Sequence, residues 1–189
     1  MLKATIALIF QKGGWKFSGK LPKRAKKTIF VSAPHTAKRD FFLAVAIVYL
    51  TKFTARIAVS DKYNWFPSNF FLRYLGAKFL PANDKKTAQR TLFNLFNDRA
   101  RYSIIITPGY GLRSEQDWDE SFYDLSVKTG AAICMVSIDR PLKKVNFHTH
   151  FFPSNDRERD LAYVRKWFGS LEKFESEDGV LAIDTQSDG

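Results

Sequence analysis

Three short runs of β-branched and apolar residues constrain the fold of this chain most strongly. They occupy residues 28–33, 102–107 and 132–138. Each run is apolar on both faces of an extended chain, which is typical of strands buried within a mixed or parallel sheet. The segments between them carry apolar residues at helical spacing, as in residues 85–100. Strands that alternate with helices predict an α/β fold in which helices flank a mixed, largely parallel sheet.

Weaker patterns predict the remaining elements of this fold. Gly76 and Gly130 each follow a helical pattern and are expected to end the helix. Residues 145–152 alternate between apolar and polar, which predicts a hairpin at the edge of the sheet. The predicted helices are 2–10, 40–53, 67–75, 85–100, 120–128 and 156–174, and the other predicted strands are 15–19, 56–60 and 77–81.

The length and the composition favour one globular domain. The 189 residues are 45% hydrophobic, enough for one core, so we expect a single domain over residues 1–174 and a flexible acidic tail over 175–189. The single cysteine, Cys134, cannot form an internal disulfide, which favours a reducing compartment. No apolar run approaches the ~20 residues that span a bilayer, and the apolar start lacks a signal-peptide cleavage site. We therefore expect a peripheral protein on the cytoplasmic side of a membrane.

The net charge of +11 is concentrated at the start of the chain. Residues 1–60 contain twelve Lys and Arg side chains and one acid, Asp40, whereas residues 61–189 contain eighteen of each sign. Basic residues between positions 12 and 56 could bind anionic lipid headgroups, at ~1 kcal/mol per side chain near the surface. They would suit nucleic acid phosphates equally well. A solvated face is a third explanation, and the charge alone favours it slightly.

A histidine and an aspartate stand at the junction between a predicted strand and a predicted helix. His35 and Asp40 are separated by four residues in the segment Ser32–Asp40. On one continuous helix they would point about 140° apart, but they can meet if His35 lies in the turn and Asp40 in the first helical turn. A histidine acts well as a base when an acceptor orients its second ring nitrogen. Spacing alone nevertheless favours an ordinary structural histidine.

Five ordered segments together resemble the glycerolipid acyltransferase family, which includes lysophosphatidic acid acyltransferases. The similarity is greatest to short bacterial-type members without a membrane helix. Ser32–Phe42 resembles the first block of that family, His-x4-Asp. The other matching segments are Gly14–Gly19, Lys62 with Phe71–Gly76, Ile105–Ser114, and Trp118–Tyr123 with Phe151–Asp156.

The resemblance implies transfer of an acyl chain to a lysophospholipid hydroxyl. The co-substrate would be an acyl-CoA or an acyl carrier protein thioester (acyl-ACP), with no bound cofactor and no metal. His35 would deprotonate the hydroxyl and Asp40 would orient His35, without a covalent intermediate. Arg113, in a turn with Gly111 and Ser114, would bind the phosphate of the acceptor.

Lys62 is a further candidate for the phosphate.

Three blocks depart from the family pattern, and in the fourth block the usual proline is replaced within Ala131–Ile133. Pro81-Ala82 stand where the family has Asp-Arg, and Lys85 or Lys86 could substitute for that arginine. Gly109-Tyr110 replace the glutamate of the third block. These changes motivate an alternative, in which a catalytically impaired protein of the same fold is an interaction or lipid-binding subunit of a larger assembly. Nucleic acid binding ranks third, because no RNA-binding motif supports it.

Two other features each have two explanations. His148-Thr149-His150 resembles a metal-binding pair, but no third ligand is near it in the sequence, so surface histidines are favoured. The aromatic-rich stretch 62–74 could face lipid or pack in the core, and the sequence supports both equally.

Overall fold

The computed structural model describes residues 2–19, 25–32, 55–61, 64–65, 67–74, 76–81, 83–106, 120–139, 141–154 and 156–169. The chain forms two compact units, Met1–Pro153 and Ser154–Gly189. The first unit contains the sheet, and the second contains a single described helix over residues 157–169. Among the residues placed by the structure, no helix is long and apolar enough to cross a membrane.

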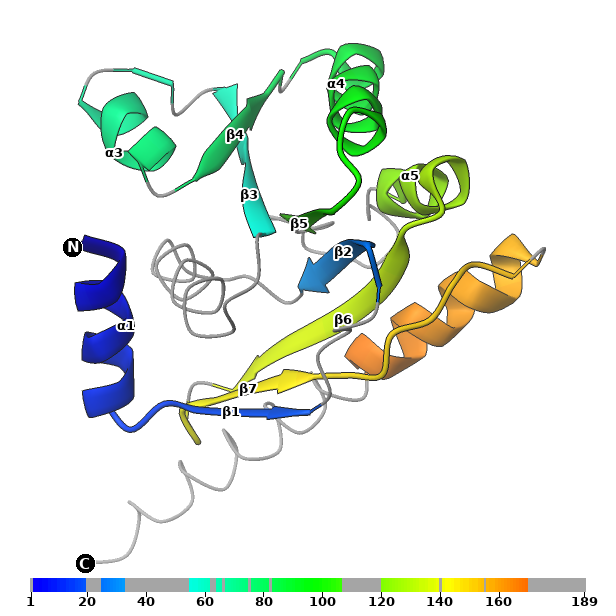
Figure 1. Cartoon of the computed structure of the whole chain (residues 1–189). Helices are drawn as coiled ribbons and strands as arrows, with labels where there is room; N and C mark the ends of the chain where they lie inside the picture. Colours follow the sequence, from blue (N-terminus) through cyan, green and yellow to red (C-terminus); the bar gives the residue numbers. More distant parts are fainter. Residues whose placement is uncertain are drawn as a thin grey trace, which may run out of the picture. The chain divides into compact units, whose positions relative to one another are not determined.

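The first unit is built on a seven-stranded sheet in the order β1-β7-β6-β2-β5-β3-β4 (Figure 1). All neighbours pair in parallel except β6 and β7, so β1 and β7 run against the other five strands. The predicted mixed, largely parallel sheet is therefore confirmed. The strands are β1 (Lys16–Gly19), β2 (Lys27–Ser32), β3 (Ala55–Ser60), β4 (Ala77–Leu80), β5 (Tyr102–Ile106), β6 (Ala132–Asp139) and β7 (Lys144–Phe147).

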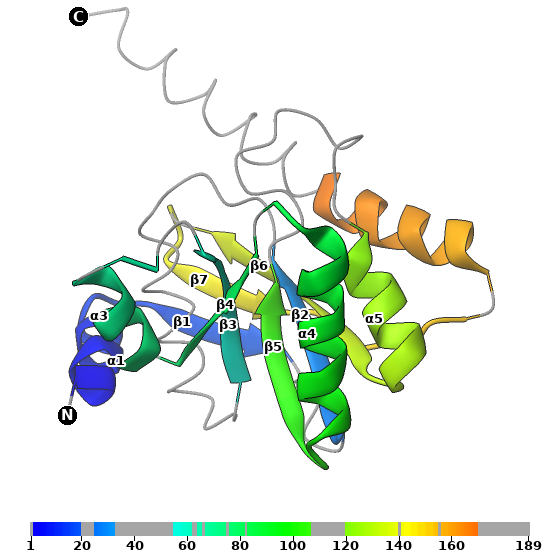
Figure 2. The same ribbon diagram turned by 90° about the horizontal axis from the view of Figure 1, so that it is seen from above.

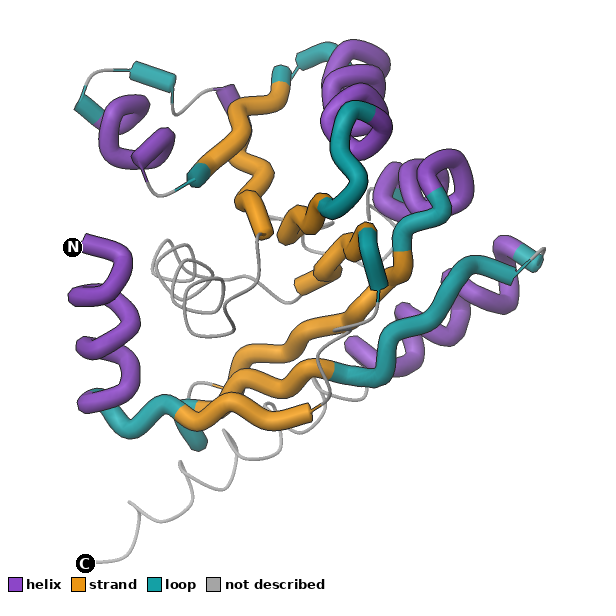
Figure 3. The backbone as a smooth tube through the Cα atoms, in the orientation of Figure 1, coloured by secondary structure: helices purple, strands orange, loops and turns teal. Residues whose placement is uncertain are grey.

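Helices lie on both sides of this curved sheet. α4 (Lys85–Asn97) and α5 (Ser121–Thr129) lie on one side, whereas α1 (Leu2–Lys12) and α3 (Ser68–Tyr74) lie on the other (Figures 1 and 2). The tube in Figure 3 shows the same arrangement of helix and strand layers. All four helices were predicted, α1 and α4 from the spacing of their apolar residues and α3 and α5 with the glycines that follow them as helix ends. The predicted helix over 40–53 lies outside the described residues.

The core lies on the three central strands, which were recognised from their continuous apolar runs. β2 is hydrogen-bonded between β5 and β6, and its residues Ile29 and Val31 are completely buried. On β6, the whole span from Ala132 to Ile138 is buried. From the helices, Phe96 of α4 and Phe122 of α5 add two fully buried rings. A strand buried on both faces cannot alternate polar and apolar residues, which explains the runs.

Local polar contacts define the ends of α4 and α5. Asp84 precedes α4 and accepts a hydrogen bond from the Thr87 backbone nitrogen at 3.0 Å, so it is the N-cap of this helix. Gly130 ends α5 with a left-handed backbone, φ 63°, as predicted. The hydroxyl of Ser126 then donates to the Ala131 carbonyl at 2.5 Å and ties α5 to the start of β6.

The edge of the sheet beside β7 differs from the prediction. Residues 144–147 do form a hairpin with β6, but β1 pairs along the other side of β7 and is the true edge strand. A side-chain hydrogen bond from Ser18 to Asn146 links the two strands. β1 ends at Gly19, whose φ of +94° and close approach to Phe147 leave no room for a Cβ atom.

The second unit begins with a capped helix. Asp156 accepts a hydrogen bond from the Arg159 backbone nitrogen at 3.0 Å, and Asp160 accepts one from the Ser154 hydroxyl at 2.9 Å. Leu161, Val164 and Phe168 are buried, consistent with the apolar face predicted for this helix. The prediction of one domain over residues 1–174 stays a prediction.

Candidate functional site

The carboxyl ends of β2 and β5 lie side by side at one edge of the sheet. Val31 is the register partner of Ile106, the last residue of β5, and Ser32 ends β2 beside Val136 of β6. Neighbouring strands are about 4.8 Å apart, so the two segments that leave this edge start next to each other. In open α/β sheets, ligands bind outside the carboxyl ends of the strands. This edge is therefore the candidate site.

The residues predicted to perform the chemistry lie in the segments that leave this edge. His35 and Asp40 follow β2, and Gly111, Arg113 and Ser114 follow β5. All five lie outside the described residues, as does Lys62, which follows β3. The structure therefore describes the strands that lead to these residues and shows that β2 and β5 are neighbours. The roles of the side chains themselves stay predictions.

The framework beneath this edge is rigid and apolar. Ile29 and Ile104 are fully buried register partners on β2 and β5. Phe30 is also buried, and its ring packs edge to face against the ring of Phe147 on β7, with centroids 6.1 Å apart. Side chains packed in this way have little freedom, so β2 presents the segment after Ser32 from a fixed starting point.

The second block of the resemblance lies at the end of β4. β4 pairs with β3 up to Leu80, its last residue, and Pro81 follows half-buried. Asp84 is committed to the cap of α4, and its hydrogen bonds from Thr87 lower the pKa of its carboxyl group. The next residues, Lys85 and Lys86, are both exposed in the first turn of α4. They are the cations that the structure describes just after Pro81.

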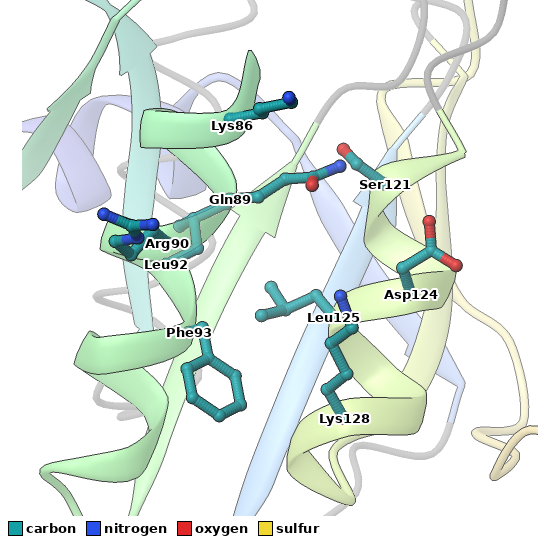
Figure 4. Close-up of a pocket in the computed structure, with 9 residues that line it drawn as sticks. All are labelled: Lys86, Gln89, Arg90, Leu92, Phe93, Ser121, Asp124, Leu125 and Lys128. Atoms are coloured by element: carbon teal, nitrogen blue, oxygen red, sulfur yellow. The ribbon is translucent and has the colours of Figure 1, made fainter. Parts of the chain in front are cut away.

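Sequence reasoning missed a groove between α4 and α5 (Figure 4). It has a volume of about 360 Å³. Leu125 points into the space between the helices, and Gln89 of α4 and Ser121 of α5 reach towards each other. Three cations and one acid surround it, so the groove combines an apolar floor with a mainly positive rim. Its lining consists of Lys86, Gln89, Arg90, Leu92, Phe93, Ser121, Asp124, Leu125 and Lys128. The groove forms between two helices whose contact no local sequence pattern shows, so the sequence carried no signal of it.

The single thiol has no catalytic character. Cys134 is fully buried in β6, and its Sγ lies 3.4 Å from the carbonyl oxygen of His148. Burial raises the pKa of this thiol to about 12. A protonated, enclosed thiol is a poor nucleophile, so Cys134 is a packing residue.

His148 and His150 form no metal site with the other residues that the structure describes. Within those ranges, no group of three or more His, Cys, Asp or Glu side chains could hold a metal ion. The backbone nitrogen of His148 donates to Met135 at 2.9 Å, and the ring of His150 lies edge to face with Phe152. The first contact extends the pairing of this segment with β6, whereas the second lies within the segment itself.

The architecture is that of an α/β domain on a largely parallel sheet, with the candidate site at the carboxyl ends of two adjacent strands. No protein-family model matches the chain, and no curated protein matches it significantly in sequence.

Among solved structures, the chain is similar to the crystal structure of the 1-acyl-sn-glycerophosphate (LPA) acyltransferase, PlsC, from Thermotoga maritima. The TM-score is 0.61 at 18% sequence identity, over 92% of this chain and 79% of that chain. The acyltransferase-like fold predicted from the motifs is thereby confirmed.

Proposed function

We propose that the protein is an acyltransferase that moves a fatty acyl chain from an acyl-CoA or acyl-ACP thioester to the hydroxyl of a lysophospholipid. The observation that carries this proposal is the adjacency of the carboxyl ends of β2 and β5, because the His-x4-Asp segment follows one strand and the segment that contains Arg113 follows the other. The similarity of the fold to a 1-acyl-sn-glycerophosphate acyltransferase supports it.

Chain connectivity is compatible with a shared site. His35 follows Ser32 by three residues, and three residues span at most about 11 Å. Arg113 follows Ile106 by seven residues, which can reach about 25 Å. Two segments with these reaches, leaving adjacent strands, can converge on one substrate.

The proposed reaction proceeds in one displacement. His35 accepts the proton of the acceptor hydroxyl, whose oxygen forms a bond to the thioester carbonyl carbon. The carbon–sulfur bond then breaks, and the proton on His35 passes to the departing thiolate. Asp40 accepts a hydrogen bond from the second ring nitrogen of His35 and keeps the first one available as the base.

The phosphate of the acceptor would be held by Arg113. A guanidinium group can donate two parallel hydrogen bonds to phosphate, and the backbone around Gly111 and Ser114 can add further donors. Lys62 would contribute charge from the segment after β3. The basic residues between positions 12 and 56 would hold the protein on an anionic membrane surface, where its acceptor is found.

Histidine variants test the base directly. The His35→Ala variant should lose about 10²–10⁴-fold in kcat/KM for transfer of a labelled acyl group from acyl-CoA to lysophosphatidic acid. The matched control is His150→Ala, because His150 lies next to Phe151, which pairs with Ile133 near the start of β6, away from the carboxyl edge. Full activity of His35→Ala would refute this mechanism.

A variant of the arginine tests the phosphate site separately. Arg113→Ala should raise KM for lysophosphatidic acid and leave KM for an acceptor without phosphate, such as a monoacylglycerol, unchanged. An equal loss for both acceptors would contradict a phosphate-binding role for Arg113.

The substitutions at Pro81-Ala82 and Gly109-Tyr110 favour a second candidate function. An acyltransferase-fold protein that lacks the acidic and basic residues of those blocks could serve as a lipid-binding or interaction subunit of a larger assembly. This candidate predicts no turnover by the purified protein with either donor and any lysophospholipid. Measured turnover that depends on His35 would exclude it.

A further inference from the structure

The helices α1 and α3 expose an unusual amount of large apolar side chain. Among the residues that the structure describes, nine large hydrophobic side chains are prominently exposed, and five of them belong to these helices or to the turn before α3. We call these five residues the α1/α3 face. It consists of Leu8, Ile9, Trp65, Phe70 and Tyr74.

The aromatic part of this face is displayed by the local geometry of α3. Phe70 is 74% exposed and Trp65 is 59% exposed. Phe70 and Tyr74 are four residues apart in the helix, so they lie on the same side of it. The backbone nitrogen of Asn69 donates to the carbonyl of Trp65 at 2.8 Å, which joins the turn carrying Trp65 to the helix. The exposure of these rings excludes core packing as their role.

Both helices that carry these residues lie on one side of the sheet. α1 and α3 lie opposite α4 and α5 (Figures 1 and 3). Ile9 of α1 is 62% exposed, although its spacing from Leu2 had placed it on the apolar side of the helix. With its neighbour Leu8, Ile9 gives α1 an exposed apolar patch of the kind that binds a partner or a membrane surface.

Charge identifies the partner of this face. α1 and α3 contain no acidic residue, and they carry the basic residues Lys3, Lys12 and Arg73. The guanidinium group of Arg73 lies over the ring of Phe79, 5.5 Å from its centroid, and so connects α3 to β4. Trp and Tyr side chains near cations suit the boundary between lipid headgroups and acyl chains, where the apolar part of the ring is buried and its polar atom stays hydrated.

We infer that the α1/α3 face inserts into the surface of a bilayer that contains anionic lipids. Insertion adds an apolar contribution to the charge attraction proposed above for the basic residues, and it would keep the protein at the membrane when salt screens the charges. The inference rests on the proposed function only for its purpose, since the face would bring the site to a lipid acceptor.

Vesicle flotation of the purified full-length protein tests this inference. The vesicles contain phosphatidylcholine alone, or phosphatidylcholine with about a third phosphatidylglycerol. We expect the protein to float with the anionic vesicles, and the Phe70→Ser variant to lose about tenfold or more in its partition coefficient. Phe70→Trp should retain binding, because tryptophan is equally suited to the interface.

The matched control is Phe152→Ser, which removes another exposed phenylalanine, from the segment that follows β7. This variant should float like the wild type. Far-UV circular dichroism checks that each variant is folded, and Trp65→Ser provides a second variant of the same face. Undiminished flotation of folded Phe70→Ser and Trp65→Ser, or an equal loss in Phe152→Ser, would overturn the inference.

Two further outcomes are decisive. If Phe70→Ser changes the mass measured by light scattering and leaves flotation unchanged, a second copy of the chain covers this face and the inference is wrong. The flotation contains no acyl donor, so it is independent of catalysis. A protein that acylates a water-soluble short-chain acceptor and fails to float would refute the membrane inference alone, whereas one that floats without turnover would refute the proposed reaction alone.

Discussion

Replacing Gly19 by alanine should detach the edge strand β1. The backbone of Gly19 has a φ of +94°, and an added Cβ atom would overlap the carbonyl oxygen of Phe147 and lie 2.8 Å from its carbonyl carbon. Both atoms belong to the backbone of Phe147 at the end of β7, so they cannot move aside as the end of a flexible side chain could. The pairing of Gly19 with Phe147 must therefore open.

The magnitude follows from two contributions. A positive φ costs an alanine about 1–2 kcal/mol. Opening the end of the β1–β7 ladder, with its Ser18–Asn146 hydrogen bond, removes two or three hydrogen bonds worth about 1 kcal/mol each. The free energy of unfolding should fall by about 3 kcal/mol or more, which corresponds to a fall in Tm of about 6–12 °C for a chain of this length.

Gly130→Ala separates the two contributions. Gly130 also has a positive φ, +63°, but an added Cβ would meet nothing within 4 Å. This variant should show the backbone strain alone, about 1–2 kcal/mol. Thermal unfolding followed by circular dichroism compares the two proteins, and amide hydrogen exchange at Phe17 and Val145 reports on the ladder. If Gly19→Ala retained exchange protection there and melted no lower than Gly130→Ala, the steric argument would be refuted.

Two further predictions concern titratable groups. Hydrogen bonds from Thr87 lower the pKa of Asp84, so the stability that this cap contributes should be present above the ordinary aspartate pKa and be lost as the pH falls below about 4. Asp84→Asn, which keeps an accepting oxygen, should remove this pH dependence from urea unfolding curves, and an unchanged profile would exclude Asp84 as its source. Burial raises the pKa of Cys134 to about 12, so the native thiol should react with a disulfide reagent at pH 8 only as fast as the protein unfolds. Rapid labelling of the folded protein would contradict that assignment.

The central strands were predictable because their signal is local. Residues 28–33, 102–107 and 132–138 are short runs that are rich in β-branched residues and apolar on both faces, which is the pattern of a strand buried on both sides. The capping residues are equally local, as Gly130 at the end of α5 illustrates. These features depend on neighbours in the sequence and need no knowledge of distant contacts.

Features that depend on distant contacts were missed or left open. The edge position expected for residues 145–152 was wrong because β1, far away in the sequence, pairs outside β7. The sequence left the surface position of Phe70 undecided, because a helix rich in aromatic residues has the same sequence pattern whether or not another element covers it. For the candidate site, the strands that support it were predicted correctly. The roles of His35 and Asp40 rest on the motif, and they stay predictions until the variants are assayed.

The pairing of β1 with β7 also determines when β1 can join the sheet as the chain is synthesised. Ser18 and Asn146 are bonded partners that are 128 residues apart. A ribosome releases the N-terminus first, and domains fold as their contacts emerge. Among the described strands β1 pairs only with β7, so it cannot join the sheet until β7 has left the ribosome, and closing so long a loop is slow. The strand β1, with α1 just before it, consequently stays unpaired along this side while the 128 residues from Ser18 to Asn146 are synthesised, and it is open to chaperones or to a membrane during that interval.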